Sequence, residues 1–341
     1  MREARRTGPS RWSRWVLALA TLALTSCAGG GHRGAVTPPT SSLPLLRSAG
    51  QTPSAGDLGD PSLLTVPAGP TGPGRYVLFG TGDWPSNVPT AVSSDLKSWR
   101  PGADALPVVP AWSKTDRYHS RIWAPAVSAV GSRWLLYITV PDRGSGRQCI
   151  AVAASGRPEG PYRDAIGHPL VCQSSLDGSI DPAIARGDAG MTLLWKSDGN
   201  CCGLPATLWS QSLRAGGLAV TGPAHPLLAA SRSWQAGVIE EPAMVPASRG
   251  GWWLFYSGGP FDRESYAIGV ASCPTLAGPC TDRSAQPYRA SVPGQRSPGG
   301  LDVFRDLDGR LRAVFDTWTR PPRDGRYYCC RAIDLAEVTG L

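Results

Sequence analysis

The segment Trp134-Leu135-Leu136-Tyr137 is one of five short apolar and aromatic segments that recur along the chain. The other four are Tyr76-Val77-Leu78-Phe79, Thr192-Leu193-Leu194-Trp195, Trp253-Leu254-Phe255-Tyr256 and Arg312-Ala313-Val314-Phe315. Their first residues lie 58, 58, 61 and 59 positions apart. A regular period of tens of residues indicates a repeat architecture, in which each repeat is one small structural unit.

Turn residues and further strand-like segments surround these repeats. Turns such as Gly131-Ser132 and Asp308-Gly309 precede the aromatic segments, and apolar segments such as 150–153 and 268–271 follow them. No amphipathic helix of useful length intervenes. About four short strands in each of five repeats predict an all-β, five-bladed β-propeller, with the aromatic residues in the core between blades. The alternative is a large β-sandwich in which the spacing is a coincidence.

The composition agrees with a large, turn-rich globular domain. Gly 41 and Pro 33 among 341 residues favour turns over a helical bundle. Hydrophobic residues make up 41% of the chain and charged residues only 18%, which argues against disorder and predicts a large core.

The N-terminus has the features of an export signal. Arginines precede an apolar run, 15–24, which is too short to span a membrane. The run ends in Leu24-Thr25-Ser26-Cys27, which resembles a bacterial lipobox. We therefore expect 1–27 to be a lipoprotein signal peptide, with lipidated Cys27 anchoring the chain outside the cytoplasm on the cell membrane. Ordinary cleavage nearby, with Cys27 incidental, is the alternative.

This assignment divides the chain and changes its charge. Residues 28–56, rich in Gly, Pro, Ser and Thr, are predicted to form a tether, and 57–341 the propeller. Five arginines and Glu3 leave with the signal peptide, so the formal charge of +8 falls to about +4. No basic stripe with interleaved aromatic residues remains, which argues against a nucleic-acid partner.

Eight cysteines remain after Cys27, an even number that suits disulfides in an oxidising compartment. Cys273 and Cys280 are close enough in sequence to close a small loop, and Cys149 with Cys172 is a second plausible pair. The adjacent pairs Cys201-Cys202 and Cys329-Cys330 are left over, for which disulfides are favoured over a soft-metal site.

Acidic residues recur just ahead of the aromatic segments. The dipeptides Asp60-Pro61, Ala124-Pro125, Asp181-Pro182 and Glu241-Pro242 have prolines 64, 57 and 60 positions apart, and a fifth copy at 300–303 lacks the proline. The first strand of each propeller blade lines the central channel, so Asp60, Asp181 and Glu240 or Glu241 should converge on one rim. The simpler explanation is that X-Pro steps mark strand entrances and acids cap turns.

A cluster of carboxyl groups can provide an acid and a base in one pocket. Neighbouring carboxylates raise the pKa of at least one group while another stays ionised. Two carboxyl groups about 6.5–9.5 Å apart leave room for a water molecule, as in an inverting glycosidase.

The ordered motifs resemble glycoside hydrolase family 43, the arabinanase, arabinofuranosidase and β-xylosidase group. The matching segments are 59–61, 123–125, 179–182, 239–242, 94–99 and 160–162. The resemblance implies inverting hydrolysis of arabinofuranosyl or xylosyl linkages in polysaccharides or oligosaccharides. It implies that Asp60 is the general base, that Asp181 modulates the pKa of the acid, and that Glu240, two residues before the proline, is the general acid.

The repeat period and the family spacing differ by one residue in the fourth motif. The period puts Glu241 in register, whereas the resemblance selects Glu240, which we follow. Because successive side chains of a strand point to opposite faces, only one of the two is expected to face the channel.

The chain departs from the family in the fifth repeat. Members often carry a His there, near or on a bound calcium, where this chain has Pro298-Gly299-Gly300, and an aromatic-His pair where it has Phe315-Asp316. Asp302 or Asp316 could compensate, but no metal or other cofactor is assigned. The loss keeps a competing hypothesis open, a non-catalytic glycan-binding lipoprotein on a degenerate hydrolase propeller. A related enzyme acting on fructosyl or mannosyl linkages is a third alternative.

Two tryptophans are predicted to contact substrate. Trp84 lies in a loop after the first aromatic segment, and Trp123 precedes Ala124-Pro125 and should form the floor of the pocket. Both could instead have purely structural roles. His119 and Arg331 are weaker candidates. Beyond the glycan substrate and the membrane, we expect no nucleic-acid partner, and we expect a monomeric protein.

Overall fold

The computed structural model describes residues 43–52, 58–70, 72–82, 85–114, 121–320 and 331–341. These residues form five four-stranded antiparallel sheets, which confirms the predicted five-bladed β-propeller. The predicted signal peptide with Cys27, and also Trp84, His119 and the Cys329-Cys330 pair, lie outside the described residues.

We number the sheets as blades 1 to 5 in the chain order of their innermost strands. Blade 1 contains β2 (Gly59–Val66), β3 (Arg75–Thr81), β4 (Thr90–Ser93) and β5 (Arg100–Pro101). Blade 2 contains β6 (Trp123–Val130), β7 (Arg133–Pro141), β8 (Gln148–Ser155) and β9 (Arg163–Asp164). Blade 3 contains β10 (Ser179–Gly187), β11 (Gly190–Ser197), β12 (Thr207–Leu213) and β13 (Val220–Ala229).

Blade 4 contains β14 (Ile239–Pro246), β15 (Trp252–Gly258), β16 (Ala267–Cys273) and β17 (Thr281–Asp282). Blade 5 contains β18 (Arg296–Arg305), β19 (Leu311–Trp318), β20 (Arg331–Thr339) and β1 (Leu45–Thr52). In the described part of the chain, three short 3₁₀ helices lie in the connections, η1 (Ser174–Leu176), η2 (Gly199–Cys202) and η3 (Ser233–Gln235).

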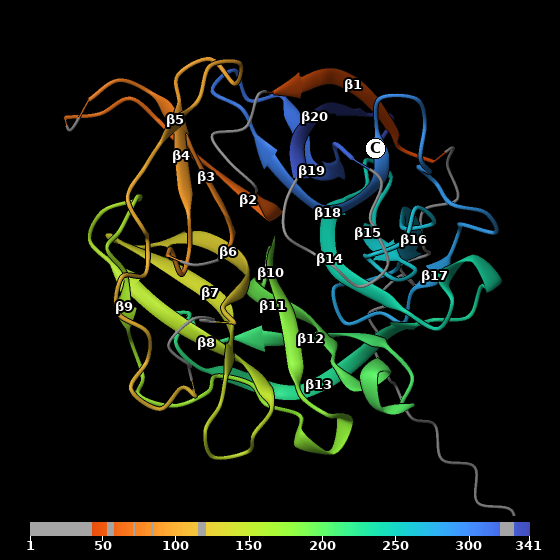
Figure 1. Cartoon of the computed structure of the whole chain (residues 1–341), viewed down its shortest axis with the longest axis horizontal. Helices are drawn as coiled ribbons and strands as arrows, with labels where there is room; N and C mark the ends of the chain where they lie inside the picture. The colour runs from red at the N-terminus through yellow and green to blue at the C-terminus, as the bar shows by residue number, and fades with distance from the viewer. Residues whose placement is uncertain (1–42, 53–57, 71, 83–84, 115–120, 321–330) are drawn as a thin grey trace, which may run out of the picture. The chain divides into compact units, whose positions relative to one another are not determined.

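The innermost strands close a ring. Strand β2 contacts β6, β6 contacts β10, β10 contacts β14, β14 contacts β18, and β18 returns to β2. Figure 1 shows these five strands around the centre, with the remaining strands of each blade further out. The proline motifs therefore lie on the strands that line the channel, and the aromatic segments lie on the second strand of each blade, as predicted.

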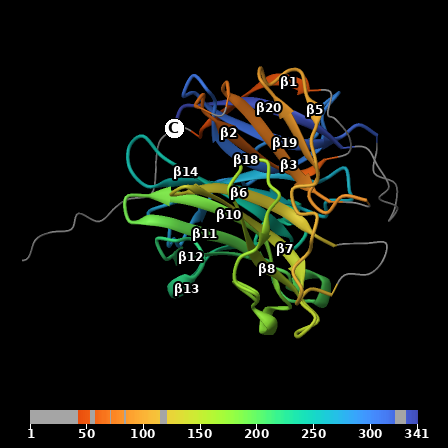
Figure 2. The same ribbon diagram turned by 90° about the vertical axis from the view of Figure 1, so that its left-hand side faces the viewer.

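Strand β1 corrects the predicted boundary of the propeller. Residues 28–56 were expected to form a tether, but β1 pairs antiparallel with β20 as the outer strand of blade 5. Both views show β1 beside β20 (Figures 1 and 2). An unpaired edge exposes backbone hydrogen-bonding groups, and β1 covers the edge of β20. Its weak apolar pattern follows from its outer position, where Leu45 is half exposed.

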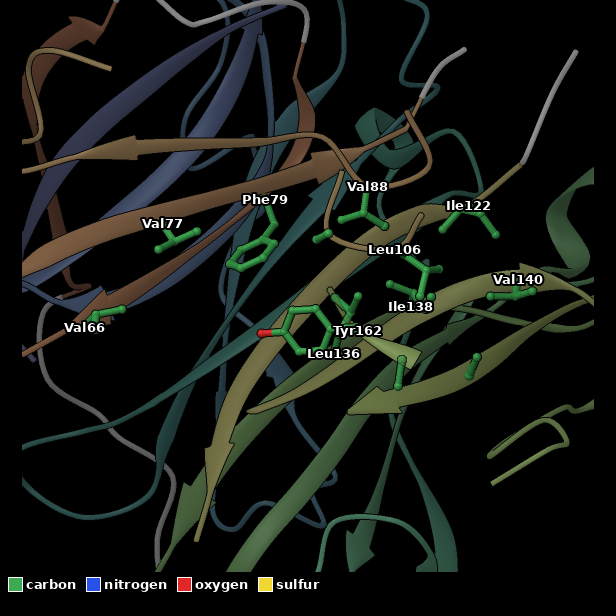
Figure 3. Close-up of a cluster of buried hydrophobic side chains, with 13 residues drawn as sticks. Val66, Val77, Phe79, Val88, Leu106, Ile122, Leu136, Ile138, Val140 and Tyr162 are labelled. Atoms are coloured by element: carbon green, nitrogen blue, oxygen red, sulfur yellow. The ribbon is translucent and has the colours of Figure 1, made fainter. Parts of the chain in front are cut away.

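The core lies mainly between neighbouring blades. Between blades 1 and 2, Val77 and Phe79 of β3 pack with Leu136 and Ile138 of β7 in one cluster of buried side chains (Figure 3). The fully buried side chains include Trp195, Trp253, Tyr137, Tyr256, Phe79, Phe255 and Phe315 from the repeated aromatic segments. The repeat is therefore a repeat of core positions, and burial of the aromatic side chains stabilises each blade against the next.

Both predicted disulfides are present. Cys149 of β8 is bonded to Cys172, and Cys273 of β16 is bonded to Cys280. Among the cysteines that the structure describes, Cys201 and Cys202 are not in a disulfide, although one was favoured for this pair. Within the described residues, no helix has the length and apolar character needed to cross a membrane.

Candidate active site

Each innermost strand carries a β-bulge at the proline motif. In β2, Gly59 pairs with Thr81 and Ser62 with Phe79, so three steps on β2 oppose two on β3. The same extra residue occurs between Trp123 and Ala126, Ile180 and Ala183, Glu240 and Ala243, and Gly299 and Asp302. A bulge of this kind bends the strand and redirects side chains, and bulges are frequent beside active sites.

The first bulged residue has a left-handed backbone in all five blades. Its φ is 51° at Asp60, 46° at Ala124, 56° at Asp181, 52° at Glu241 and 61° at Gly300. This conformation is uncommon for residues other than glycine and is retained where the surrounding structure fixes it. The three acidic positions of the repeat, Asp60, Asp181 and Glu241, therefore share one local geometry, and their convergence on one rim is borne out.

These residues lie where the channel meets a large pocket. The channel holds a cavity of about 130 Å³, to whose lining Asp60, Asp181 and Glu241 contribute. The same three residues also line a pocket of about 970 Å³. Glu240 and Trp123 line this larger pocket. A cavity of this size suits a small-molecule or oligosaccharide ligand.

Only one of Glu240 and Glu241 lines the channel, as expected, and it is Glu241, the residue in register with the repeat, not Glu240. Both side chains line the large pocket, and Glu241 also lines the channel. The physical reason is the bulge at Glu241 and Pro242, which interrupts the alternation of side chains along β14. The pocket thus contains one more carboxyl group than the resemblance implies.

A buried ion pair holds Asp60 from the side of blade 5. The backbone N–H of Asp60 donates a 2.8 Å hydrogen bond to Oδ2 of Asp316, which is fully buried. Arg331 forms an ion pair with that same Asp316 oxygen, and its guanidinium lies 3.8 Å from Oδ1 of Asp60. Thr81 donates its hydroxyl to the Asp60 carboxylate. These contacts fix the side chain of Asp60 at the channel mouth.

A buried lysine and a tyrosine hold the two glutamates. Nζ of Lys196, whose side chain is 2% exposed, lies 2.9 Å from Oε2 of Glu240. The Tyr266 hydroxyl lies 2.7 Å from Oε1 of Glu240 and 3.0 Å from Oε2 of Glu241. Ser257 donates a 2.9 Å hydrogen bond to the same oxygen of Glu241. Neighbouring residues therefore fix both carboxyl groups within the pocket.

The pocket holds more carboxyl groups than cationic side chains, and this excess of acidic groups raises carboxyl pKa values. Burial raises the pKa of Glu241 well above its usual value, and the charges of Asp60 and Asp181 and a hydrogen bond with Asp60 raise it further. Burial likewise raises the pKa of Asp181, although Lys196 opposes the shift. Burial raises the pKa of Asp198 to about 6. In this arrangement the protonated form of both Glu241 and Asp181 is favoured relative to a carboxyl group in water.

The residues of blade 5 do not fit a calcium ion. Both carboxylate oxygens of Asp302 accept backbone hydrogen bonds, from Leu63 and from Val303. Asp316 is already paired with Arg331, whose positive charge would repel a cation. A side chain at Gly299 would collide with the ring of Tyr266, since an added Cβ would lie 1.9 Å from that ring. Neither aspartate replaces the histidine ligand.

The predicted substrate residues have different outcomes. Trp123 and Arg331 line the large pocket, and the guanidinium of Arg331 lies 4.9 Å from the ring centre of Trp318. Trp84 lies outside the described residues. The role of Trp123 as a sugar contact stays a prediction.

Lys196 was not among the site residues predicted from the sequence. The position after each aromatic segment is Gly80, Ile138, Lys196, Ser257 and Asp316 in the five repeats. Charged residues in otherwise apolar strands are rarely buried without a partner. The charged residues at these two positions could therefore have indicated the site. Lys196 is buried against Glu240, and Asp316 is buried against Arg331. Tyr266, in contrast, lies outside the repeat and has no such signal.

A five-bladed propeller with a carboxylate-rich pocket at one end holds the acid and base groups that hydrolysis of a glycosidic bond uses. The sequence model of glycosyl hydrolases family 43 matches residues 54–339, and the chain belongs to this family of glycosidases. It is 27% identical over 299 residues to a probable arabinan endo-1,5-alpha-L-arabinosidase A of Aspergillus flavus, covering 77% of this chain and 85% of that protein. The Aspergillus oryzae protein of the same name gives the same values.

Solved structures share the fold. A thermostable family-43 glycoside hydrolase superimposes with a TM-score of 0.72 at 21% identity, covering 86% of this chain and 96% of that one. An endo-arabinase from Bacteroides thetaiotaomicron gives a TM-score of 0.65 at 18% identity, covering 84% and 96%.

Proposed function

We propose that the protein hydrolyses α-L-arabinofuranosyl linkages of arabinan-type glycans with inversion of the anomeric configuration. The observation that carries the proposal is the convergence of Asp60, Asp181 and the Glu240–Glu241 pair on one large pocket. The curated relatives named as arabinosidases support the choice of arabinosyl over xylosyl substrates.

Each acid has a proposed role in one displacement. Asp60, held by Thr81 and Arg331, takes a proton from a water molecule whose oxygen attacks the anomeric carbon. The bond from that carbon to the leaving oxygen breaks, and Glu240 gives its proton to that oxygen. Asp181 lies close enough to Glu240 for their charges to interact, as a modulator of the acid requires.

Glu241 has a separate role in this proposal. Its raised pKa favours the protonated form and it shares a hydrogen bond with Asp60, so we propose that it orients the base. Glu240 is favoured as the donor because it follows the family spacing and does not line the channel, where Glu241 faces the other acids. The positive charge of Lys196 interacts with the carboxyl groups of Glu240, Asp181 and Asp198.

The alternative of non-catalytic glycan binding predicts no intact acid pair. Asp60 and Glu240 line the same pocket, which favours hydrolysis. Incubation with arabinan, arabinoxylan and nitrophenyl pentosides, followed by proton NMR, tests the proposal. We expect arabinan cleavage, with the first-formed product carrying the inverted configuration. A retained configuration would refute the mechanism, and cleavage of xylosides alone would refute the substrate.

We also propose that the chain is exported and lipid-anchored through Cys27. The basic residues, apolar run and Leu24-Thr25-Ser26-Cys27 motif support this proposal, and the two disulfides agree with an oxidising compartment. Metabolic labelling with a radioactive fatty acid in a bacterial host should label the wild type and not Cys27→Ala. Equal labelling of both would contradict the anchor.

A further inference from the structure

A pair of adjacent cysteines borders the large pocket. Cys201 and Cys202 lie in η2, which follows Asp198 and the end of β11 that carries Lys196. Both cysteines are exposed, and Cys201 belongs to the lining of the pocket. The catalytic proposal makes no use of either residue.

The two sulfur atoms are held close together. Sγ of Cys201 lies 2.8 Å from Sγ of Cys202. The two thiols donate hydrogen bonds of 3.0 and 2.8 Å to the same atom, Oδ2 of Asp177. Asp177 is fixed by an ion pair between its other oxygen and Arg147. A single fixed acceptor atom, Oδ2 of Asp177, thus holds the two sulfur atoms close together.

The backbone of η2 is packed in this conformation. An added Cβ at Gly199 would lie 2.6 Å from Cβ of Leu204 and 3.1 Å from the carbonyl oxygen of Leu176. The amide of Leu204 donates a 2.9 Å hydrogen bond to the carbonyl of Gly199, and Gly203 ends the turn with a φ of 77°. The sulfurs are therefore preorganised by the loop and do not meet by chance rotation.

The sulfur separation favours a disulfide over a metal site. Asp177 and the two cysteines could together offer three ligand atoms to a metal ion. Two thiolates on one tetrahedral zinc ion, each about 2.3 Å from the metal, lie about 3.8 Å apart. A disulfide bond is about 2.05 Å long, so a 2.8 Å pair lies less than about 1 Å from bonding. The Arg147 charge at Asp177 also opposes a bound cation.

We propose that Cys201 and Cys202 form a vicinal disulfide that makes part of the pocket wall and contacts a sugar unit of the substrate. The two thiols lose two protons and two electrons, and an external disulfide, such as oxidised glutathione, accepts both and becomes two thiols. Oxidation removes two S–H donors and leaves a compact, polarisable surface for the C–H face of a sugar ring. The contact with substrate rests on the proposed function, whereas the disulfide does not.

Peptide mapping tests the disulfide without any assay of activity. The full chain, folded in a glutathione redox buffer, is denatured, alkylated without reduction and digested with trypsin. The peptide 197–214 contains Cys201, Cys202 and no other cysteine. We expect this peptide unalkylated and lighter than the dithiol by two hydrogen atoms. Two alkyl groups on the peptide, or a crosslink to a second peptide, would overturn the proposal.

Steady-state kinetics test the contact with substrate. The variant Cys201→Ser/Cys202→Ser should raise KM for arabino-oligosaccharides about tenfold, the low end of what a small apolar contact contributes in a pocket, with kcat little changed. The matched control Cys273→Ser/Cys280→Ser loses a disulfide that does not line the pocket and should keep KM unchanged. An unchanged KM in the first variant would overturn the contact. If the wild type cleaves no pentoside, the proposed function fails while the peptide mass still decides the disulfide.

Discussion

Replacing each glutamate of the adjacent pair by glutamine separates their proposed roles. Glu240→Gln removes the proton donor but keeps the size and polarity of the side chain beside Lys196 and Tyr266. General acid catalysis contributes about 10²- to 10⁴-fold. Turnover of arabinan should therefore fall by this factor, which corresponds to about 3–5 kcal/mol of activation free energy at 1.36 kcal/mol for each tenfold change.

The leaving group provides the assay. The dinitrophenolate group of a dinitrophenyl arabinofuranoside leaves without being protonated, so Glu240→Gln should slow the hydrolysis of this substrate by less than about tenfold. Glu241→Gln should behave differently, since a neutral amide imitates the protonated carboxyl group that hydrogen-bonds to Asp60. We expect less than about tenfold loss on both substrates for this variant.

Two results would refute this reasoning. A selective loss on arabinan in Glu241→Gln would make Glu241 the proton donor, and equal losses on both substrates in Glu240→Gln would exclude proton donation by Glu240. Asp60→Asn is the matched control, because both substrates need an activated water and should lose activity alike. Thermal unfolding midpoints of all variants establish that the fold is intact.

Two further predictions concern pH. Lys196→Met removes the positive charge that opposes the raised pKa of Asp181, so that pKa should rise further and the kcat/KM profile should move to higher pH; a profile that moves to lower pH would contradict the role of Lys196. Arg312 forms an ion pair with Asp306. Burial alone would raise the pKa of Asp306, but hydrogen bonds, first among them that from Arg312, hold this pKa below its usual value. Arg312→Met should lower the free energy of unfolding by about 1–2 kcal/mol at pH 7. A lowered carboxyl pKa stabilises only above the pKa of the unfolded chain, so urea titrations should show this difference shrinking as the pH falls below about 4, and a constant difference would exclude the ion pair as its cause.

The repeat explains why most of the fold could be predicted from the sequence. Buried aromatic residues such as Trp195 and Phe315 must recur once per blade because each blade packs on the next in the same way. Strand β1 could not be predicted, since an outer strand is mostly exposed and its partner β20 lies at the other end of the propeller sequence, where Thr339 pairs with Leu45.

Three acids of the site could be placed from the repeat in the sequence, whereas the position of a fourth could not. Asp60, Asp181 and Glu241 occupy repeat positions, so their convergence follows from the period alone. That Glu240 also faces the pocket depends on a bulge, which changes side-chain directions without leaving any mark in the apolar pattern.

The sequence by itself determined a five-bladed ring with carboxyl groups at one end, because period and residue type are local properties of the chain. Tertiary structure alone decided which charges meet. Lys196 of blade 3 meets Glu240 of blade 4, and Arg331 of blade 5 lies beside Asp60 of blade 1. Electrostatic interactions depend on distance and burial, which are set only when the blades close into a ring.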